Sequence, residues 1–279
     1  MSVEVQSYHE TSEWKLAAIP FLKKEEAWNN LFWQIIENRE KSLKKLWAGN
    51  VCFNESVCLS ALHTPSNFLL LSQGSKKAVE HLAQYSIHQN WSLDGVSGPE
   101  DIVSHFLDST EKLGERKKIS GSRQFKIFQT RTGEELNKDF EQYSLVSATS
   151  LDWPKARIWA QQFSSEMETQ MDLSATVQMA KKMYLNQTLY LLRDIDNHPC
   201  AMAGFGRNTD NYRVINMVFV PENLRGMGLG SELIKRMTIF SRESGFENCL
   251  LFSEWKEARN LYDLIGCKCL GSFVEYDLS

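Results

Sequence analysis

The residues best suited to chemistry in this chain lie in one short glycine-rich stretch. Residues 218–230 read Val-Phe-Val-Pro-Glu-Asn-Leu-Arg-Gly-Met-Gly-Leu-Gly, an apolar run that stops at a proline and continues into Gly226, Gly228 and Gly230. Backbone N–H groups at the start of a helix can point at one anion when no side chain blocks the approach, and glycine keeps that approach open. The stretch therefore predicts a cradle for phosphate groups, with pyrophosphate as its natural ligand.

Two common phosphate-binding loops fit this spacing poorly. A P-loop ends in Gly-Lys followed by Ser or Thr, whereas this chain has Gly230-Ser231-Glu232 and no lysine there. A dinucleotide fingerprint needs Gly-x-Gly-x-x-Gly and an acidic residue about 20 positions later to hold a ribose. Here the third glycine comes one position early, and Glu254, the acid that ends the next expected strand, lies further away than that.

The stretch resembles the acyl-CoA site of the GNAT N-acyltransferase superfamily. Its signature is a strand, then Arg or Gln-x-x-Gly-x-Gly or Ala, then a helix, and Arg225, Gly228 and Gly230 match it position by position. Residues 261–267, Leu-Tyr-Asp-Leu-Ile-Gly-Cys, resemble the closing Leu-Tyr-x-x-x-Gly-Phe/Tyr motif of the same superfamily. The resemblance covers roughly residues 144 to 279.

Hydrophobic periodicity predicts the elements on both sides of the loop. Tyr212–Val220 is apolar and β-branched enough for a buried strand that Pro221 ends. A helix should follow and stop at Gly245. Its apolar face is Leu229, Leu233, Ile234, Met237 and Phe240, while Glu232, Lys235, Arg236, Arg242 and Glu243 are expected to face away.

The rest of this region gives an order of elements typical of a GNAT domain. We expect strands at 144–148, 188–193, 201–207, 249–252 and 272–277, and helices at 153–168, 176–185 and 256–265. The Asp196–Pro199 loop is a hairpin connection by composition.

The N-terminal half has the composition of a second folded domain. A chain of 279 residues is long for one domain of this kind. Apolar runs at Leu31–Ile36, Val57–Leu62 and Phe68–Leu71 alternate with helical stretches such as Lys76–Ser86. Segments 21–31 and 95–100 resemble the start of two-domain bacterial GNAT proteins, and no Arg-x-x-Gly-x-Gly occurs before residue 140. The resemblance thus implies a degenerate GNAT-like domain without a cofactor loop.

The expected fold is α/β, of the α+β type with a mixed sheet, in two tandem GNAT-like domains of which the C-terminal one is complete. Boundary signals occur at Ile119–Arg123 and in the polar stretch Arg131–Asp139. We therefore expect a GNAT-like domain over residues 1–125, a linker over 126–143 and the acetyltransferase domain over 144–279.

Composition excludes several classes of protein. The net charge of −4 argues against electrostatic capture of nucleic acid. No apolar stretch approaches the roughly 18 residues of a membrane span, and Met1–Lys15 lacks the order of a signal peptide, so we expect a cytoplasmic protein. The six cysteines, at 52, 58, 200, 249, 267 and 269, form no Cys-x-x-Cys pair, and we expect thiols and no metal.

The resemblance implies acyl transfer from acetyl-CoA to an amine, with the following site. The backbone of Val218, Phe219 and Val220 would contact the acyl group and pantetheine beside a bulge. The pyrophosphate would be wrapped by Arg225, Gly226, Met227, Gly228, Leu229, Gly230 and Ser231. The alternative interpretations are a surface salt bridge for Arg225 and an ordinary tight turn for the glycines.

Tyr262 matches the tyrosine that relatives place near the CoA sulfur. A phenol, pKa about 10, can donate a hydrogen bond or a proton to the leaving thiolate, whose pKa is about 8.5 by analogy with cysteine. The alternative is a packed tyrosine with its hydroxyl at the surface. Trp255, Lys256 and Arg259 stand where relatives often have an asparagine that holds the pantetheine arm, so this chain would hold the arm differently.

The general base stays open. The strand 215–220 has Asn216 as its polar residue and carries no carboxylate, so the candidates lie elsewhere, and His198 has no partner pattern. They are Glu166, Asp172, Glu254 and Glu275.

Three functions remain compatible with the sequence. The first is an N-acetyltransferase that acts on a small molecule, amino acid or peptide amine by direct attack in a ternary complex. The second is an acyl-CoA-binding sensor or scaffold with little turnover, and the third is a protein-interaction module. The N-terminal domain is expected to cover the substrate cleft or to form a homodimer.

Overall fold

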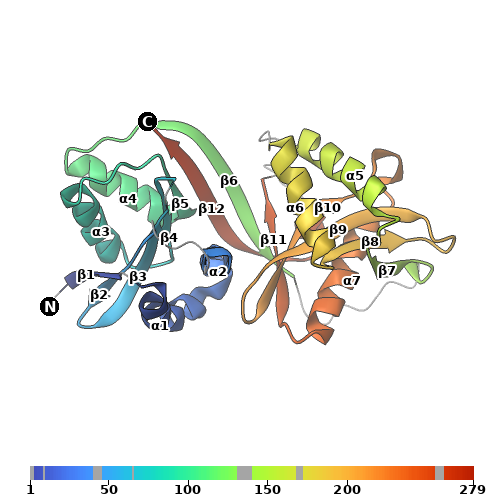
Figure 1. Ribbon diagram of the computed structural model, residues 1–279, viewed down its shortest axis with the longest axis horizontal. Coiled ribbons are helices and arrows are strands. Elements are labelled where there is room, and N and C mark those ends of the chain that lie inside the picture. Colours follow the sequence, from blue (N-terminus) through green and yellow to red (C-terminus); the bar gives the residue numbers. More distant parts are fainter. Residues whose placement is uncertain are drawn as a thin grey trace. The chain divides into compact units, whose positions relative to one another are not determined.

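The computed structural model describes residues 3–8, 10–39, 46–64, 66–130, 140–167, 172–254 and 261–279 (Figure 1). The chain forms two compact units. Unit 1 contains Met1–Phe125 together with Gly271–Ser279, and unit 2 contains Lys126–Leu270. In the part of the chain that the structure describes, no helix has the length and apolar character needed to cross a membrane.

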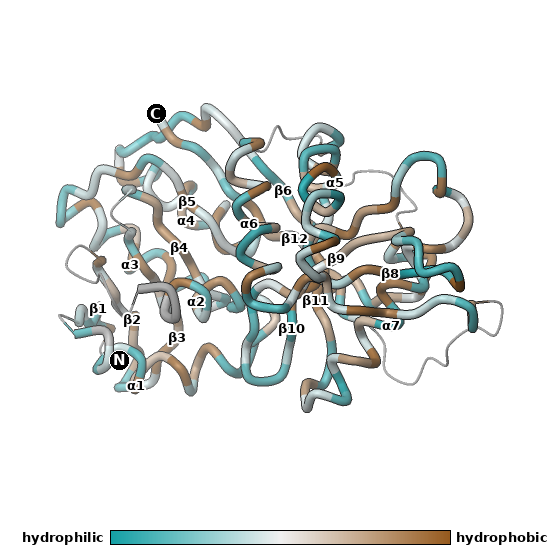
Figure 2. Tube along the Cα trace, turned by 45° about the vertical axis from the view of Figure 1, so that its right-hand side comes forward, coloured by the Kyte–Doolittle hydropathy of each residue, from teal (hydrophilic) through white to brown (hydrophobic). Residues whose placement is uncertain are grey.

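Unit 1 is a mixed sheet with helices packed on it. Its elements are β1 (Val3–Tyr8), α1 (Thr11–Leu22), η1 (Lys23–Glu25), α2 (Glu26–Arg39), β2 (Trp47–Phe53), β3 (Ser56–His63), β4 (Phe68–Leu71), α3 (Lys76–His88), β5 (Gly95–Pro99), α4 (Glu100–Lys112) and β6 (Ile119–Gln129). Strands β4 and β5 are parallel, and β1–β2, β2–β3 and β3–β4 are antiparallel. The wholly apolar β4, brown in Figure 2, contributes Leu69 and Leu71 to a core with Val79, Leu82 and Phe106 from α3 and α4.

Unit 2 has a sheet in the order β6-β11-β10-β9-β8-β7. Its elements are β7 (Ser144–Ser147), α5 (Trp153–Glu166), α6 (Leu173–Leu185), β8 (Leu189–Arg193), β9 (Pro199–Asn208), β10 (Tyr212–Phe219), η3 (Glu222–Leu224), α7 (Leu229–Glu243), β11 (Asn248–Ser253) and α8 (Leu261–Leu264). Strand β12 (Lys268–Leu278) follows in the chain, but from Gly271 on it belongs to unit 1, just as the end of β6, from Lys126 on, belongs to unit 2. Strands β10 and β11 are parallel, and β9 pairs antiparallel with both β8 and β10.

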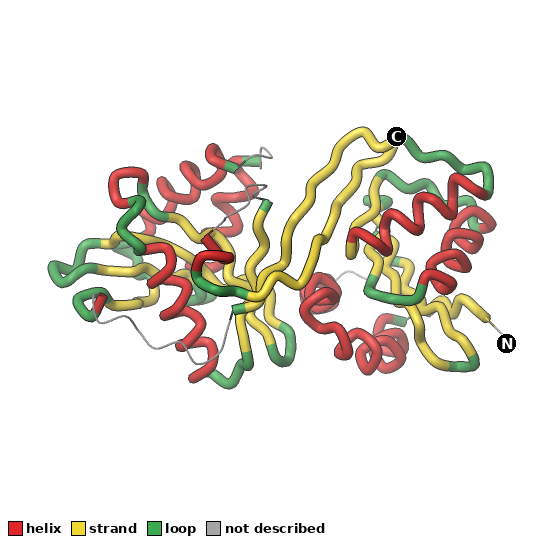
Figure 3. The backbone as a smooth tube through the Cα atoms, turned by 180° about the vertical axis from the view of Figure 1, so that it is seen from behind, coloured by secondary structure: helices red, strands yellow, loops and turns green. Residues whose placement is uncertain are grey.

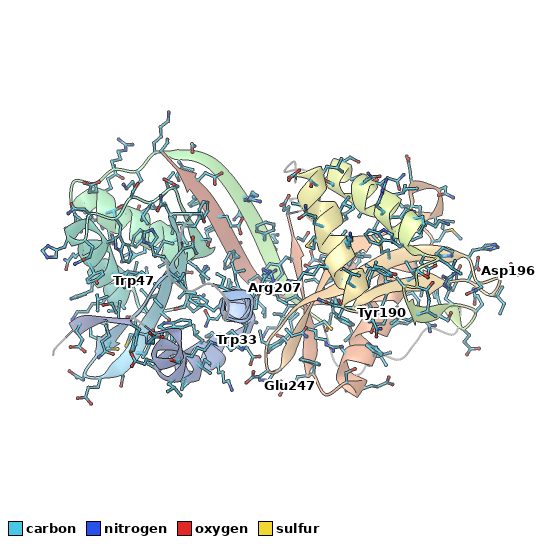
Figure 4. The ribbon with its side chains drawn as sticks, viewed as in Figure 1. Trp33, Trp47, Tyr190, Asp196, Arg207 and Glu247 are labelled. Atoms are coloured by element: carbon cyan, nitrogen blue, oxygen red, sulfur yellow. The ribbon has the colours of Figure 1, made fainter. Side chains whose placement is uncertain are left out.

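The two faces of this sheet carry separate cores because side chains alternate along each strand. Helix α7 packs on one face through Leu233 and Met237, and α5 and α6 pack on the other through Trp159 and Met183. Tyr190 of β8, labelled in Figure 4, joins the sheet to α7, since its ring centroid lies 5.1 Å from that of Phe240. The sheet thus fixes the start of α7 relative to β10.

Both units repeat one order of elements: strand, two helices, three strands, helix, strand, helix, strand. Figure 3 distinguishes the helices and strands of both units by colour. Their last strands are exchanged. β5 of unit 1 pairs with the end of β12, Phe273–Asp277, whereas β11 of unit 2 pairs with the end of β6, Lys126–Gln129. Each unit therefore completes its sheet with the strand that follows the other unit's last helix.

The expected α/β fold with a mixed sheet is confirmed, and so are the strands and helices predicted between residues 144 and 279 that lie within the described residues. The segment Ile119–Arg123, interpreted as a boundary, lies in strand β6. It is polar because cross-strand charges support it, and Arg123 Nη2 lies 3.2 Å from Glu275 Oε2. The stretch 131–139 lies outside the described residues, and the domain ranges remain predictions.

Candidate active site

A bulge interrupts β10 just before the glycine-rich loop. Asn216 pairs with Gly204 and Phe219 with Met202, so β10 advances three residues while β9 advances two. Met217 takes the extra turn with a φ of 56°, a left-handed conformation that is uncommon outside glycine. The ladder between β10 and β11 ends at Ile215–Leu251. Residues 216–219 therefore lie beyond the described pairing with β11, although Asn216 and Phe219 still pair with β9.

The side chains around the bulge are anchored on both faces of the sheet. Val218 and Val220 pack on the α7 side, whereas Phe219 is buried on the α5 side. The ring centroid of Phe219 lies 5.9 Å from that of Trp159. Because the side chains are fixed, the backbone of the predicted pantetheine-binding residues is held in one position.

Glycine suits each of the three positions in the loop for a different local reason. Gly226 and Gly228 both have a φ of 77°, in the left-handed region that favours glycine. Among the described residues, no atom lies within 4 Å of where a Cβ on Gly226 would be, so they leave this side of the loop open. A Cβ on Gly228 would lie 3.0 Å from Cζ of Phe140, and one on Gly230 would lie 3.1 Å from Cδ2 of Leu261. The second and third glycines thus let other segments pack closely on the loop.

Helix α7 begins directly after the loop, and no side chain caps its N-terminus. Gly228 is the N-cap residue and α7 begins at Leu229. Leu229 is buried in the core and can offer only its backbone, whereas Met227 is 54% exposed and Ser231 is half-buried. Uncapped N–H groups and the positive end of the helix dipole favour an anion at this point.

Arg225 is already bound to two protein groups. Its Nε donates to the carbonyl of Val220 at 2.9 Å, and its Nη2 donates to Oε2 of Glu166 at 2.6 Å. Both ionic side chains are nearly half exposed, at 44% and 46%. The salt bridge that sequence offered as the alternative is therefore present, and it links the loop to the end of α5.

Tyr262 lies on the short helix α8, next to the residue that packs on Gly230. Its ring centroid is 5.4 Å from that of Phe128 in an edge-on arrangement. Burial raises the pKa of Tyr262 above its ordinary value, and the nearby Cys267 adds to that shift. The phenol therefore stays protonated through neutral pH and can donate. Trp255, Lys256 and Arg259 lie outside the described residues.

All four candidate bases interact with other groups of the protein. Glu166 pairs with Arg225, Asp172 accepts from the backbone N–H of Ser174 at 3.0 Å as a helix cap, and Glu275 pairs with Arg123 in unit 1. Glu254 is half-buried just after β11. His198 is exposed in its hairpin loop, 3.5 Å from Asp194.

One ion pair next to the loop, Glu232–Arg236, was not predicted from the sequence. Glu232 was expected to face away from the core, yet its side chain is 2% exposed. It is buried because Arg236, one turn along α7, neutralises it at 2.6 Å, and Arg236 also donates to the carbonyl of Phe140 at 2.9 Å. The i,i+4 spacing of Glu232 and Arg236 is the sequence signal that would have found the pair.

Metal ligands and disulfides do not contribute to the described site. Among the described residues, no group of three His, Cys, Asp or Glu side chains could hold a metal ion. The six cysteines are free thiols, of which Cys52, Cys200 and Cys249 are buried.

Comparison with known proteins gives a family for part of the chain and a fold for all of it. The model of the Acetyltransferase (GNAT) family matches residues 151–266. No curated protein matches the chain. A GCN5-related N-acetyltransferase from Sphaerobacter thermophilus is 12% identical with a TM-score of 0.62, over 98% of this chain and 94% of that one.

Two further solved structures have the same fold. A GNAT-family acetyltransferase from Colwellia psychrerythraea is 11% identical with a TM-score of 0.57, over 99% of this chain and 100% of that one. A Drosophila protein is 12% identical with a TM-score of 0.60, over 99% and 98% of the two chains. At these identities the likeness establishes the fold alone.

Proposed function

Because residues 151–266 belong to the GNAT acetyltransferase family, we propose that the chain is an N-acetyltransferase. It transfers the acetyl group of acetyl-CoA to a primary amine of a small molecule, amino acid or peptide in a ternary complex. The observation that carries the proposal is the open side of the loop at Gly226, directly before the uncapped start of α7 and after the bulge of β10.

The described residues fit acetyl-CoA as a substrate. The backbone N–H groups from Gly226 to Ser231 suit its pyrophosphate, because α7 has no side-chain cap, a Cβ at Gly226 would meet no described atom within 4 Å, and the helix dipole favours an anion. The backbone of Val218, Phe219 and Val220 suits the pantetheine amides and the thioester carbonyl, since it lies beyond the β11 ladder. Arg225 contributes positive charge from the rim of the loop.

The reaction needs few groups from the protein. The neutral amine attacks the thioester carbonyl, a C–N bond forms, and the carbonyl electrons move onto oxygen, where backbone N–H groups beside the bulge stabilise them. The C–S bond then breaks and the thiolate leaves, while the amine gives its extra proton to solvent. Tyr262 donates a hydrogen bond to the thiolate. Because its pKa is raised, hydrogen bonding precedes any full proton transfer.

Unit 1 has a supporting task in this proposal. The N-terminal half mediates a homodimer, as the degenerate half of a tandem protein. The protein works in the cytoplasm, and residues 144–279 remain our range for the catalytic domain with 126–143 as the linker.

A sensor or scaffold that binds acyl-CoA with little turnover is the second candidate. One observation favours it: Glu166, Asp172 and Glu275 are each engaged with a structural partner. An enzyme of this family can still remove the amine proton through a water chain. Both candidate functions therefore require binding of acetyl-CoA, and they differ in whether it is turned over.

Calorimetric titration with acetyl-CoA separates these functions. Gly226→Glu places a carboxylate at the proposed anion site, where a Cβ meets no atom within 4 Å. Gly245→Glu is its matched control, because Gly245 is also left-handed and open but lies beyond the other end of α7. We expect binding by the wild type and by Gly245→Glu, and at least about a tenfold loss in Gly226→Glu.

Each outcome of the titration has one meaning. Release of CoA from the wild type with an amine panel identifies an enzyme, and binding without release identifies a sensor. Equal binding by Gly226→Glu and Gly245→Glu contradicts the proposed site. Absence of binding by a folded wild type contradicts the proposed function altogether.

A further inference from the structure

A buried carboxylate lies in the first turn of the helix that would hold the pyrophosphate. Glu232 is 2% exposed, and its backbone N–H donates to the carbonyl of Gly228 at 3.1 Å in the first hydrogen bond of α7. Carboxylates are favoured at helix N-termini because of the dipole. At this position, however, Glu232 and a bound anion would compete for the same positive end.

Arg236 offsets that charge from the next turn. Its Nε lies 2.6 Å from Oε1 of Glu232, and the guanidinium is 14% exposed. Charges this well buried are screened only weakly by salt and water. Without Arg236 the carboxylate would face the pyrophosphate uncompensated, and the loop would repel the ligand that its backbone attracts.

The same guanidinium also fixes one wall of the loop. Arg236 Nη2 donates to the carbonyl of Phe140 at 2.9 Å. The ring of Phe140 lies against Gly228, 3.0 Å from where its Cβ would be. Phe140 thus closes the Gly228 side of the loop and leaves the Gly226 side open.

We propose that Arg236 is a positioning residue of the acyl-CoA site. It cancels the charge of Glu232 and holds Phe140 on the loop, so that the start of α7 presents one open, net positive face to the pyrophosphate. The inference rests on the proposed function, because the ligand is acetyl-CoA. It goes further, because it makes the affinity for acetyl-CoA depend on Arg236, a residue that does not touch the ligand.

The test is a set of charge variants in acetyl-CoA calorimetry, each checked by thermal unfolding. Arg236→Gln leaves Glu232 charged and buried, and we expect about tenfold weaker binding or more. The double variant Glu232→Gln/Arg236→Gln removes both charges and should recover most of the loss. Arg236→Lys keeps the charge and should bind better than Arg236→Gln.

Arg242→Gln is the matched control, because Arg242 is an exposed arginine in the last turn of the same helix. It should bind like the wild type. If Arg236→Gln weakened binding only because it destabilised the fold, the double variant would bind acetyl-CoA just as weakly. Recovered affinity in the double variant therefore indicates charge compensation.

Two results would overturn the inference while leaving the proposed function intact. The first is wild-type affinity in folded Arg236→Gln. The second is a double variant that binds no better than Arg236→Gln. If the wild type itself does not bind acetyl-CoA, the proposed function fails first, and the two failures are thus distinguishable.

Discussion

The two units place the same elements in the same order but begin the central helix in different ways. In unit 1, residues 72–75 lead from β4 to α3, and the Ser75 side chain accepts a hydrogen bond from the N–H of Ala78 at 3.3 Å. In unit 2, residues 220–228 lead from β10 to α7, and Gly228 caps the helix without a side chain. The helix N-terminus of unit 1 has a side-chain cap, whereas that of α7 has none, and it is the N-terminus of α7 that we propose as the anion site.

The strand before the helix differs in the same sense. β4 pairs with β3 in an unshifted register from Ala61–Leu71 to His63–Leu69, whereas β10 carries the Met217 bulge. Gly74 is also closed off, since a Cβ there would lie 2.6 Å from the carbonyl of Cys58. The two units therefore share one order of elements but differ in the bulge, the glycine and the helix cap at this place. These are the three features on which we base the proposed anion site of unit 2.

The largest effect we expect comes from cutting the chain where the sequence suggests. Fragment 144–279 lacks Lys126–Gln129, which pair with β11, and retains 271–279, which pair with β5. It should show no cooperative thermal transition by circular dichroism. Fragment 126–270, which is unit 2 by contacts, should show one. Equal cooperative melting of both fragments would mean that the exchanged strands are dispensable.

Tyr262→Phe tests whether Tyr262 takes part in the acetyl transfer that we propose for unit 2. We expect kcat to fall by roughly a hundredfold with little change in the affinity for acetyl-CoA, because a phenylalanine keeps the packing and loses the donor. The raised pKa keeps the phenol protonated, so the wild-type rate should show no loss from Tyr262 until the pH exceeds the ordinary tyrosine value of about 10. Steady-state rates across pH check this, and an unchanged kcat would remove Tyr262 from the mechanism.

Gly228→Ser would make the start of α7 more like that of α3. The new side chain must adopt a φ of 77°, and its Cβ would lie 3.0 Å from Phe140. The left-handed conformation alone costs about 1–2 kcal/mol. We expect about tenfold weaker acetyl-CoA binding in calorimetry, while Gly245→Ser, at another left-handed glycine, should bind normally. Undiminished affinity would show that the uncapped helix is not what distinguishes the units.

Ser75→Ala removes the cap in unit 1 and should have the smallest effect. A lost N-cap hydrogen bond lowers the free energy of unfolding by about 1 kcal/mol. Affinity for acetyl-CoA should stay the same, because unit 1 has no open loop at this helix. Chemical denaturation and calorimetry measure the two quantities. A change in affinity would indicate that unit 1 takes part in binding.

Local patterns predicted most of unit 2. The strand Tyr212–Phe219, the stop at Pro221 and the helix from Leu229 to Gly245 each follow from hydrophobic spacing and from residues that end elements. The glycine spacing likewise indicated a turn before a helix, whereas the anion cradle remains a prediction. These features depend on neighbours in sequence, so the sequence alone contains them.

Features that depend on distant partners were not predictable in the same way. β6 has polar positions that suggest a boundary, because its partner β12 supplies Glu275 and Asp277 from the far end of the sequence. Glu232 is buried and pairs with Arg236, which also donates to the carbonyl of Phe140, a residue distant in sequence. Periodicity assigns a charged residue to the surface and cannot show that another segment covers it.

The exchanged strands have a consequence for synthesis of the chain. The ribosome completes α3, α4 and β5 well before residues 271–279, yet β5 receives its antiparallel neighbour from those residues. During elongation the open edge of β5 can pair with strands of other nascent chains. We therefore expect chaperone binding at this edge to end once residues 273–277 have emerged and paired with β5, which completes the sheet of the first unit.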